Sequence, residues 1–85
     1  MRLQFSTRYK KKYRKLHIAI KYRADERLRL FVVDKFHPLL NNHSVSKIFP
    51  GCRSINVTGD YRAIFKEMET EVVFINIGTH SELYD

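Results

Sequence analysis

Residues 53–77 read RSINVTGDYRAIFKEMETEVVFINI, and this stretch decides the fold. Polar and apolar residues alternate over 53–58, and two further runs rich in β-branched and aromatic residues follow at 61–66 and 72–77. Short polar turns separate the three runs. Because successive strands joined by short turns run antiparallel, the stretch predicts a three-stranded meander.

The last run begins with VVFI at residues 72–75, which is typical of a strand buried on both faces. We therefore expect this strand to be central in the sheet. At the other end of the chain, Leu3 and Phe5 alternate with Arg2 and Gln4, which predicts a short half-buried strand over 2–6. We expect this first strand to lie beside the last one.

Two helices are predicted between the first strand and the meander. The first is capped by Ser or Thr at 6–7, and its apolar stripe of Tyr9, Tyr13 and Leu16 has helical i, i+4, i+7 spacing. The stripe loses phase near residues 17–18, so a break is expected there. The second helix is expected over 19–35 and ends before Pro38. Its buried side is marked by Ala24, Leu28, Phe31, Val32 and Phe36.

Together these elements predict an α+β fold with the order β-α-α-β-β-β. The helical hairpin packs on one face of a small, mainly antiparallel twisted sheet, and the opposite face stays partly free. A chain of 85 residues is long enough for only one hydrophobic core, so we expect a single domain over residues 1–85.

The composition excludes several classes of protein. Cys52 is the only cysteine, so an internal disulfide and a Cys-rich zinc module are excluded, and we interpret it as a buried small hydrophobe. Scattered histidines and the lack of a Gly-rich nucleotide loop, CxxC or HExxH motif predict neither metal nor cofactor. No apolar run approaches the ~20 residues that cross a bilayer, so we expect a cytoplasmic protein without membrane contact.

The formal net charge is +7, and it is unevenly distributed. Residues 1–40 hold 12 Lys and Arg against 3 Asp and Glu, whereas residues 41–85 hold 4 against 6. Such an excess attracts nucleic acid, an anionic membrane surface or an acidic partner protein, or it solvates a helix face. Nucleic acid or an acidic protein is the partner that the charge favours.

Three segments in order resemble the RelE/ParE superfamily of bacterial toxins, and in particular its YafQ-type mRNA endonucleases. They are FHPLLNNH at 36–43, GDYRAIF at 59–65 and IGTHSELY at 77–84. The resemblance covers nearly the whole chain. It implies a toxin of a type II toxin–antitoxin system that cuts mRNA, usually on the ribosome. It also implies a cognate antitoxin that forms a hetero-oligomer with the toxin, which is a monomer when free.

Metal-independent RNA cleavage uses the ribose 2′-OH as nucleophile, so the protein supplies a base, an acid and positive charge. His80 is the best candidate for proton transfer, because imidazole titrates near neutral pH and this one follows a strand end. A surface histidine in a C-terminal turn is the alternative. By resemblance His43 is the second proton-transfer group, and a histidine that only caps its loop is nearly as good an interpretation.

Three further site residues are expected from the resemblance and the strand pattern. Asp60 stands where YafQ-type enzymes place a catalytic aspartate, although Gly-Asp is also a common turn pair. Arg62 is expected on the sheet face away from the helices, where its guanidinium binds the scissile phosphate. The alternative is a cross-strand salt bridge with Glu67 or Glu71. Tyr84 matches a tail aromatic that stacks on a base, with ordinary packing as the alternative.

The chain departs from the family at Asn56, where YafQ-like enzymes have a histidine and RelE-like enzymes have lysines near this position and Ser54. Asn56 can contact RNA but transfers no proton, so we expect Arg53 and Lys47 to supply charge for RNA binding. The basic first helix contacts ribosomal RNA, docks an acidic antitoxin or is simply solvated. Its candidate RNA-binding residues are Lys11, Lys12, Arg14 and Lys15.

Three functions follow from the resemblance. The first is an mRNA interferase, meaning an endoribonuclease that cuts mRNA and stops translation. The second is a toxin without nuclease activity, similar to ParE, which poisons DNA gyrase. The third is a catalytically degenerate relative that acts only through its antitoxin complex. The fold alone does not choose among them, and the histidine and tyrosine of the tail favour the first.

Overall fold

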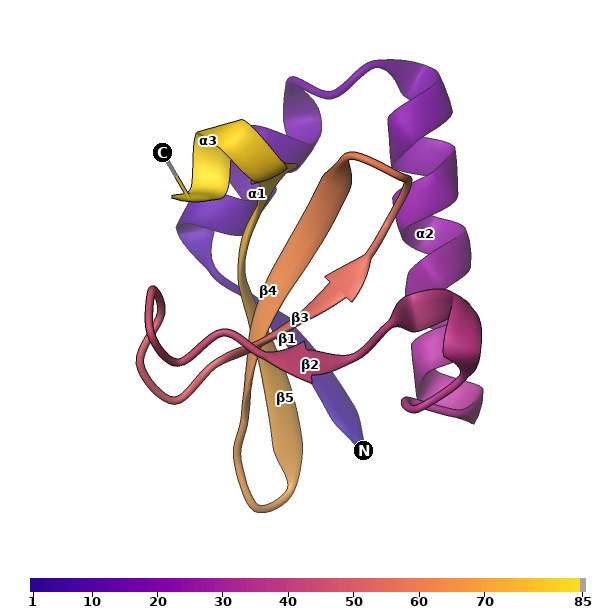
Figure 1. Cartoon of the computed structure of the whole chain (residues 1–85). Coiled ribbons are helices and arrows are strands. Elements are labelled where there is room, and N and C mark those ends of the chain that lie inside the picture. The colour runs from indigo at the N-terminus through magenta and orange to yellow at the C-terminus, as the bar shows by residue number, and fades with distance from the viewer. Residues whose placement is uncertain (85) are drawn as a thin grey trace.

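The computed structural model describes residues 1–84 as a five-stranded sheet with helices on both faces (Figure 1). The spatial strand order is β1-β5-β4-β3-β2, with β1 parallel to β5 and the other neighbours antiparallel. This is the expected mainly antiparallel α+β fold, with the first strand beside the last. The strands are β1 (Arg2–Phe5), β2 (His43–Ser44), β3 (Arg53–Asn56), β4 (Tyr61–Glu67) and β5 (Glu71–Thr79). The helices are α1 (Thr7–Arg14), α2 (Ile18–Val33), the 3-10 helix η1 (Pro38–Leu40) and α3 (His80–Tyr84).

Strand β5 is an interior strand, but it is not the central one. It lies between β1 and β4, and β4 occupies the middle of the sheet. The prediction of a central strand over 72–77 was wrong because β2 was not foreseen: a two-residue strand carries no alternation pattern to detect. β2 adds a fifth strand at the β3 edge, so the middle of the sheet is β4 alone rather than the pair of β5 and β4.

Helix α1 begins where the sequence predicts, because Ser6 caps it. The Ser6 Oγ accepts the Tyr9 N–H at 3.1 Å and donates to the Ile75 carbonyl at 2.9 Å, which ties the helix start to β5. The break before α2 is also confirmed: His17 caps that helix through its Nδ1, which accepts the Ala19 N–H at 3.1 Å.

Helix α2 ends at Val33, two residues earlier than expected. Asp34 adopts an extended conformation, and its carboxylate accepts the Phe36 N–H at 3.2 Å, so the chain leaves the helix axis there. Val32 and Phe36, which we expected to be buried, are therefore 51% and 62% exposed. Val32 lies beyond the edge of the buried stripe, and Phe36 is carried off it by the turn.

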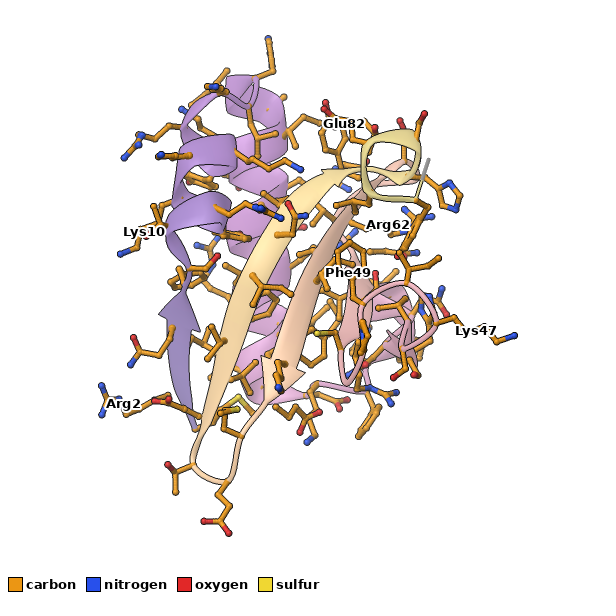
Figure 2. The ribbon with its side chains drawn as sticks, turned by 90° about the vertical axis from the view of Figure 1, so that its left-hand side faces the viewer. Arg2, Lys10, Lys47, Phe49, Arg62 and Glu82 are labelled. Carbon is orange, nitrogen blue, oxygen red and sulfur yellow. The ribbon has the colours of Figure 1, made fainter. Side chains whose placement is uncertain are left out.

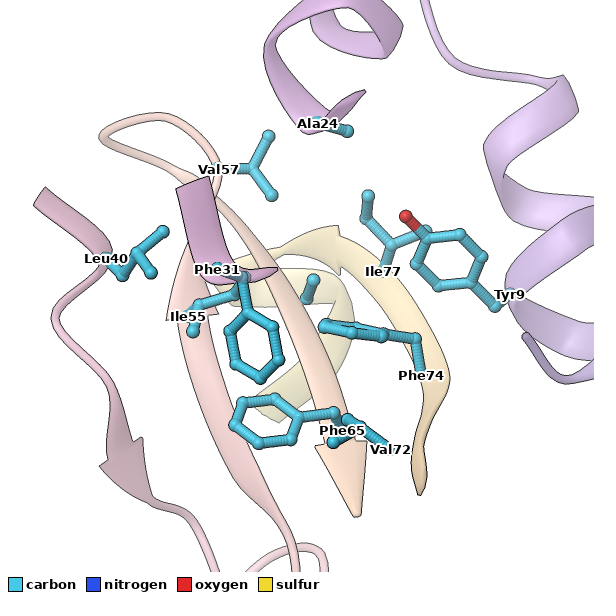
Figure 3. Close-up of a cluster of buried hydrophobic side chains, with 11 residues drawn as sticks. Tyr9, Ala24, Phe31, Leu40, Ile55, Val57, Phe65, Val72, Phe74 and Ile77 are labelled. Atoms are coloured by element: carbon cyan, nitrogen blue, oxygen red, sulfur yellow. The ribbon is translucent and has the colours of Figure 1, made fainter. Parts of the chain in front are cut away.

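The main core lies between the sheet and the pair α1 and α2 (Figure 3). Phe31 from α2, Phe65 from β4 and Phe74 from β5 are fully buried, and their ring centroids lie 5.0–5.5 Å apart. Edge-to-face and tilted contacts of this kind add about 0.5–1.5 kcal/mol per pair to the burial of the rings. This cluster holds both helices on one face of the sheet, as the sequence predicts.

The opposite sheet face is more covered than expected. The α3 residue Leu83 packs there with Ile64 of β4 and with Cys52, which is buried as the sequence predicts. Half-buried Val45 and Phe49 from the loop 45–52 extend this second cluster. Figure 2 shows α1 and α2 on one side of the strands and the loop with α3 on the other. Across residues 1–84 no helix combines the length and apolar character needed to cross a membrane.

Candidate functional site

A hollow of about 340 Å³ opens where β4, α3 and the segment around β2 meet. It gathers His43, Arg62, His80 and Tyr84, four of the five candidate catalytic residues, from three segments far apart in the sequence. The sequence reasoning did not single out its remaining lining residues, Asn41, Ser44 and Val45. Their only signal was their place in the loop that carries His43.

His80 is the first residue of α3, and its exposed side chain lines the hollow. Its backbone N–H donates to the Asp60 carbonyl at 3.0 Å, which ties the start of α3 to the turn before β4. The His80 and Tyr84 rings, one helical turn apart, have centroids 4.7 Å apart and an interplanar angle of 58°. Tyr84 also contacts Phe49, with 6.2 Å between the ring centroids, so packing holds this aromatic pair against the loop 45–52.

A capping box opens α3. The Glu82 carboxylate accepts the Thr79 N–H at 2.8 Å, and the Thr79 hydroxyl accepts the Glu82 N–H at 3.1 Å. The Thr79 backbone bond holds the pKa of Glu82 below its usual value, assisted by the Thr79 hydroxyl and the charge of Lys12. A Cβ at Gly78 would lie 3.0 Å from Lys12 Nζ and 3.1 Å from Glu82 Oε1, so a larger residue there would have to displace the ends of these two side chains slightly.

His43 lies on the edge strand β2, and its ring is both bonded to the loop and exposed to the hollow. The Nδ1 atom lies 2.7 Å from the Asn41 carbonyl oxygen. Because a carbonyl only accepts, Nδ1 carries the hydrogen, and in the neutral ring Nε2 is the basic nitrogen. Asn41 makes this contact from a left-handed conformation with φ of 47°, which asparagine tolerates better than most residues. Loop capping and access to the hollow therefore coexist.

Arg62 lies on the face expected from its strand, since its neighbours Ala63 and Phe65 point into the main core. Its Nη1 donates to the carbonyls of Thr58 and Gly59 at 3.0 Å each and to that of Tyr61 at 3.3 Å. The alternative ion pair with Glu67 or Glu71 does not form in residues 1–84, where Glu67 pairs with Lys35 at 2.9 Å. Arg62 thus brings to the hollow a positive charge that carbonyls hold and that has no carboxylate partner within residues 1–84.

Asp60 does not line the hollow. It lies in the exposed turn between β3 and β4, where the Thr58 hydroxyl accepts the backbone N–H groups of Asp60 and Tyr61 at 3.2 and 3.0 Å. The turn interpretation therefore describes its local structure. What Asp60 contributes to the site is its carbonyl oxygen, which accepts the His80 N–H.

Two polar side chains of β3 lie on the same sheet face as Arg62. Asn56 stands opposite Arg62 in the strand register, and Ser54 stands opposite His43. The Asn56 Oδ1 and the Ser54 Oγ are buried, and neither has a hydrogen-bond partner among residues 1–84. Buried polar atoms are usually bonded, so these two atoms are exceptions, and neither residue lines the hollow. Ser54 was not singled out from the sequence as a site residue.

Arg53 and Lys47 are not part of the hollow. Arg53 shares the helix-side face of β3 with Ile55, and its Nε donates to Asn42 Oδ1 at 2.7 Å. Lys47 is exposed and extends from the loop 45–52 into solvent (Figure 2). The hollow therefore takes its nearby positive charge from Arg62.

A second, basic groove of about 630 Å³ runs between α1 and α3. Lys12 anchors it, since its Nζ donates to the buried Asn76 Oδ1 at 2.8 Å and burial lowers the pKa of its ammonium group. Arg14 lies apart from this groove, in another hollow with Phe5 and Tyr13. The structure thus separates the four basic residues that the sequence grouped together. The lining of the basic groove is Thr7, Arg8, Lys11, Lys12, Lys15, Asn76 and Glu82.

Helix α3 separates the two depressions, with His80 and Tyr84 facing the hollow and Glu82 facing the basic groove. Within residues 1–84, no three His, Cys, Asp or Glu side chains gather closely enough to hold a metal ion. The chemistry that the hollow offers is proton transfer by two imidazoles beside a fixed guanidinium and an aromatic ring.

A family model described as ParE toxin of type II toxin–antitoxin system, parDE, matches residues 3–84. No curated protein sequence matches the chain. Among solved structures, the YoeB/ParE toxin from Agrobacterium tumefaciens has 14% identity and a TM-score of 0.76, covering 94% of this chain and 99% of that one.

Two complexes from E. coli are also similar in structure. The DinJ–YafQ toxin–antitoxin complex has 20% identity and a TM-score of 0.68, covering 98% of this chain and 96% of that one. The intact RelBE toxin–antitoxin complex has 21% identity and a TM-score of 0.69, covering 92% and 94%. At these identities the likeness concerns the fold, and it confirms the RelE/ParE superfamily fold that the sequence predicts.

Proposed function

Since this chain belongs to the ParE toxin family of type II toxin–antitoxin systems, we propose that it is an mRNA interferase, a toxin that cuts mRNA without a metal ion. The observation that carries the proposal is the single hollow that brings together His43, Arg62, His80 and Tyr84. Two imidazoles and a guanidinium can supply the base, the acid and the positive charge that RNA cleavage by the ribose 2′-OH requires.

In the proposed reaction His43 is the base and His80 is the acid. The Asn41 carbonyl holds the hydrogen on His43 Nδ1, so Nε2 takes the proton of the 2′-OH. The 2′-oxygen then bonds to phosphorus while the bond from phosphorus to the 5′-oxygen breaks. Protonated His80 gives its proton to the departing 5′-oxygen. The products are a 2′,3′-cyclic phosphate and a 5′-hydroxyl end, and each proton transfer contributes about 10²–10⁴-fold to the rate.

Arg62 and Tyr84 hold the substrate in this scheme. Three carbonyls fix the Arg62 guanidinium through Nη1, and its Nη2 and Nε groups contact the phosphate as negative charge builds on it. Tyr84, held between Phe49 and His80, offers a ring face on which a base next to the cut stacks. Asp60 positions His80 through its carbonyl, whereas Asn56 does not line the hollow and its Oδ1 is buried.

The test is cleavage of mRNA by the purified protein in the presence of ribosomes, with the new ends mapped by primer extension. We expect 5′-hydroxyl ends, and we expect His80→Ala and His43→Ala each to slow cleavage about 100-fold or more. His17→Asn is the matched control, because it changes an exposed histidine outside the hollow and retains a capping oxygen for α2. If folded His80→Ala cuts as fast as the parent, the role given to His80 is wrong.

We extend the proposal to a cognate antitoxin and to ribosomal RNA as partners of a cytoplasmic toxin. The related YafQ and RelE toxins were solved as complexes with DinJ and RelB. The groove between α1 and α3 carries Arg8, Lys11, Lys12 and Lys15 against the single carboxylate of Glu82, which suits acidic side chains or phosphates. Lys47, Arg53 and Arg14 lie outside both this groove and the hollow.

The second candidate function is a gyrase-poisoning toxin without nuclease activity. The observations that favour it are the ParE family match and Asn56, which stands where YafQ-like enzymes have a histidine. Controlled expression separates the two functions. DNA damage with intact mRNA would support the gyrase toxin, whereas cut mRNA without DNA damage would support the interferase.

A further inference from the structure

Phe36 is a large aromatic side chain that the fold holds in solvent. It is 62% exposed, and it lies in the turn between α2 and η1, where the Asp34 carboxylate accepts its N–H. Two cations flank its ring: Lys35 Nζ lies 5.5 Å from the centroid, and Arg53 Cζ lies 5.9 Å from it. An exposed ring with two cations this near to its centroid is unlike the isolated apolar residues that any surface carries.

Hydrogen bonds fix this arrangement. Arg53 donates to Asn42 from Nε at 2.7 Å and from Nη2 at 3.4 Å, and the Asn42 amide donates to the Lys35 carbonyl at 3.0 Å. Asn42 therefore ties the guanidinium to the segment that carries the ring. Glu67 neutralises Lys35, whereas Arg53 has no carboxylate partner within residues 1–84. We call Phe36, Lys35, Arg53 and Asn42 the platform, in which Arg53 carries a positive charge with no carboxylate partner within residues 1–84.

The platform adjoins the hollow across the edge of the sheet. Arg53 stands opposite Ser44 in the register of β2 and β3, and Ser44 lines the hollow together with His43. The Arg53 side chain lies on the helix-side face, whereas Ser54 and Asn56 lie on the face of the hollow. A bound single-stranded chain that passes over the two-residue edge strand β2 would therefore reach both the hollow and the platform.

We propose that Phe36 stacks on an unpaired base of the RNA substrate, away from the nucleotides at the cut, while Arg53 contacts an adjacent phosphate. This inference rests on the proposed RNA cleavage and adds a second binding subsite for single-stranded RNA. Aromatic side chains bind bases of any sequence by stacking, and arginine adds a charged contact. A protein partner would also find apolar Val33 and Leu39 nearby in the chain, but the uncompensated guanidinium favours a polyanion.

The chain has no tryptophan, so Phe36→Trp introduces a single fluorophore at the platform. The ligand is a short single-stranded RNA with 2′-O-methyl groups, which removes the nucleophile and prevents cleavage. We expect its binding to quench the fluorescence of the Phe36→Trp variant. Tyr22→Trp is the matched control, because Tyr22 is 65% exposed and lies about three helical turns before the end of α2. The fluorescence of this control variant should stay unchanged.

A second measurement tests whether the stack contributes to affinity. We expect Phe36→Ala to raise the Kd for the same RNA about 5- to 10-fold, the low end for loss of one stacked base, and Phe36→Tyr to restore it. The loss should also appear as a higher KM for RNA cleavage, because Phe36 is proposed to bind the substrate from outside the hollow. Equal affinity of Phe36→Ala and the parent would overturn the inference, as would fluorescence of the Phe36→Trp variant that responds only to an acidic protein.

These outcomes separate the inference from the proposed function. If the parent cuts mRNA while RNA leaves the fluorescence of the Phe36→Trp variant unquenched, the inference that the platform binds RNA is wrong. The proposed interferase function is then unaffected. If RNA quenches that variant and Phe36→Ala weakens binding while the parent cuts no mRNA, the RNA subsite stands and the nuclease assignment is wrong.

Discussion

Replacing Thr79 with Ala should loosen α3, the helix that carries His80 and Tyr84. The substitution removes the hydroxyl that accepts the Glu82 N–H at 3.1 Å, while the backbone N–H of residue 79 can still donate to the Glu82 carboxylate. Loss of a threonine cap costs about 0.5–2 kcal/mol. Because one of the two bonds of the box survives, we expect a loss of about 1 kcal/mol. For a domain of this size that lowers Tm by roughly 4–8 °C.

The charge of Glu82 adds a pH dependence to the same box. The Thr79 backbone bond holds the pKa of Glu82 below its usual value, so the folded state binds this proton less tightly than the unfolded state. Its contribution to stability is therefore complete above the unfolded pKa of about 4.3 and is lost as the pH falls through the lower folded value. We expect Glu82→Gln to reduce Tm at neutral pH and the difference from the parent to close in acid.

Circular dichroism melts from neutral to acidic pH measure both effects, and hydrogen exchange of the His80 amide reports the opening of its bond to the Asp60 carbonyl, which ties the start of α3 to the turn before β4. Thr70→Ala is the control, since Thr70 is an exposed threonine in the turn between β4 and β5. The reasoning would be refuted if the Thr79→Ala variant had the Tm of the parent and the same rate of hydrogen exchange at the His80 amide. If the Tm of the Glu82→Gln variant stayed below that of the parent in strong acid, the role of the Glu82 charge would be refuted.

Three further outcomes are expected. Tyr9→Phe should stabilise the fold by about 1–2 kcal/mol in urea titrations, because the Tyr9 hydroxyl is buried without a partner among residues 1–84 and burial raises its pKa. A loss of stability in this variant would show that the hydroxyl is bonded. Phe74→Ala should cost about 3–5 kcal/mol in the same assay, whereas Val32→Ala, 51% exposed, should change stability by less than about 0.5 kcal/mol. Changing Lys11 and Lys15 to Ala should lower the slope of log affinity for RNA against log salt by about 2; an unchanged slope would remove the basic groove from RNA binding.

The meander and the capped first helix could be predicted because their signals are local. Alternation over β3 and the run in β5 fix which faces are apolar, and Ser6 is recognisable as a cap from its place before a helical stripe. The prediction failed at Phe36, where the Asp34 side chain bonds the backbone and turns the chain away from the helix. Such a bond competes with helical continuation, and the apolar pattern does not reveal which one wins.

The site was predicted in part. The residue types of His80, Tyr84, His43 and Arg62 suggested chemistry, but their meeting in one hollow depends on the strand order and register. The position of Arg53 is an example of what the residue types leave open. A shift of one residue in register moves a side chain to the other sheet face, so its place beside Phe36 and outside the hollow was open until the pairing of β3 was known.

The sequence by itself determined that the chain forms an antiparallel meander with a basic helical hairpin, because hydrophobic period and charge belong to neighbouring residues. Only the tertiary structure decided what these elements bring together. It brought the His80 N–H to the Asp60 carbonyl and brought His43 and Arg62 to one hollow. It also divided the basic residues between the basic groove, the hollow and the platform. Those contacts join residues that are distant along the chain, and their positions depend on packing, which no local pattern encodes.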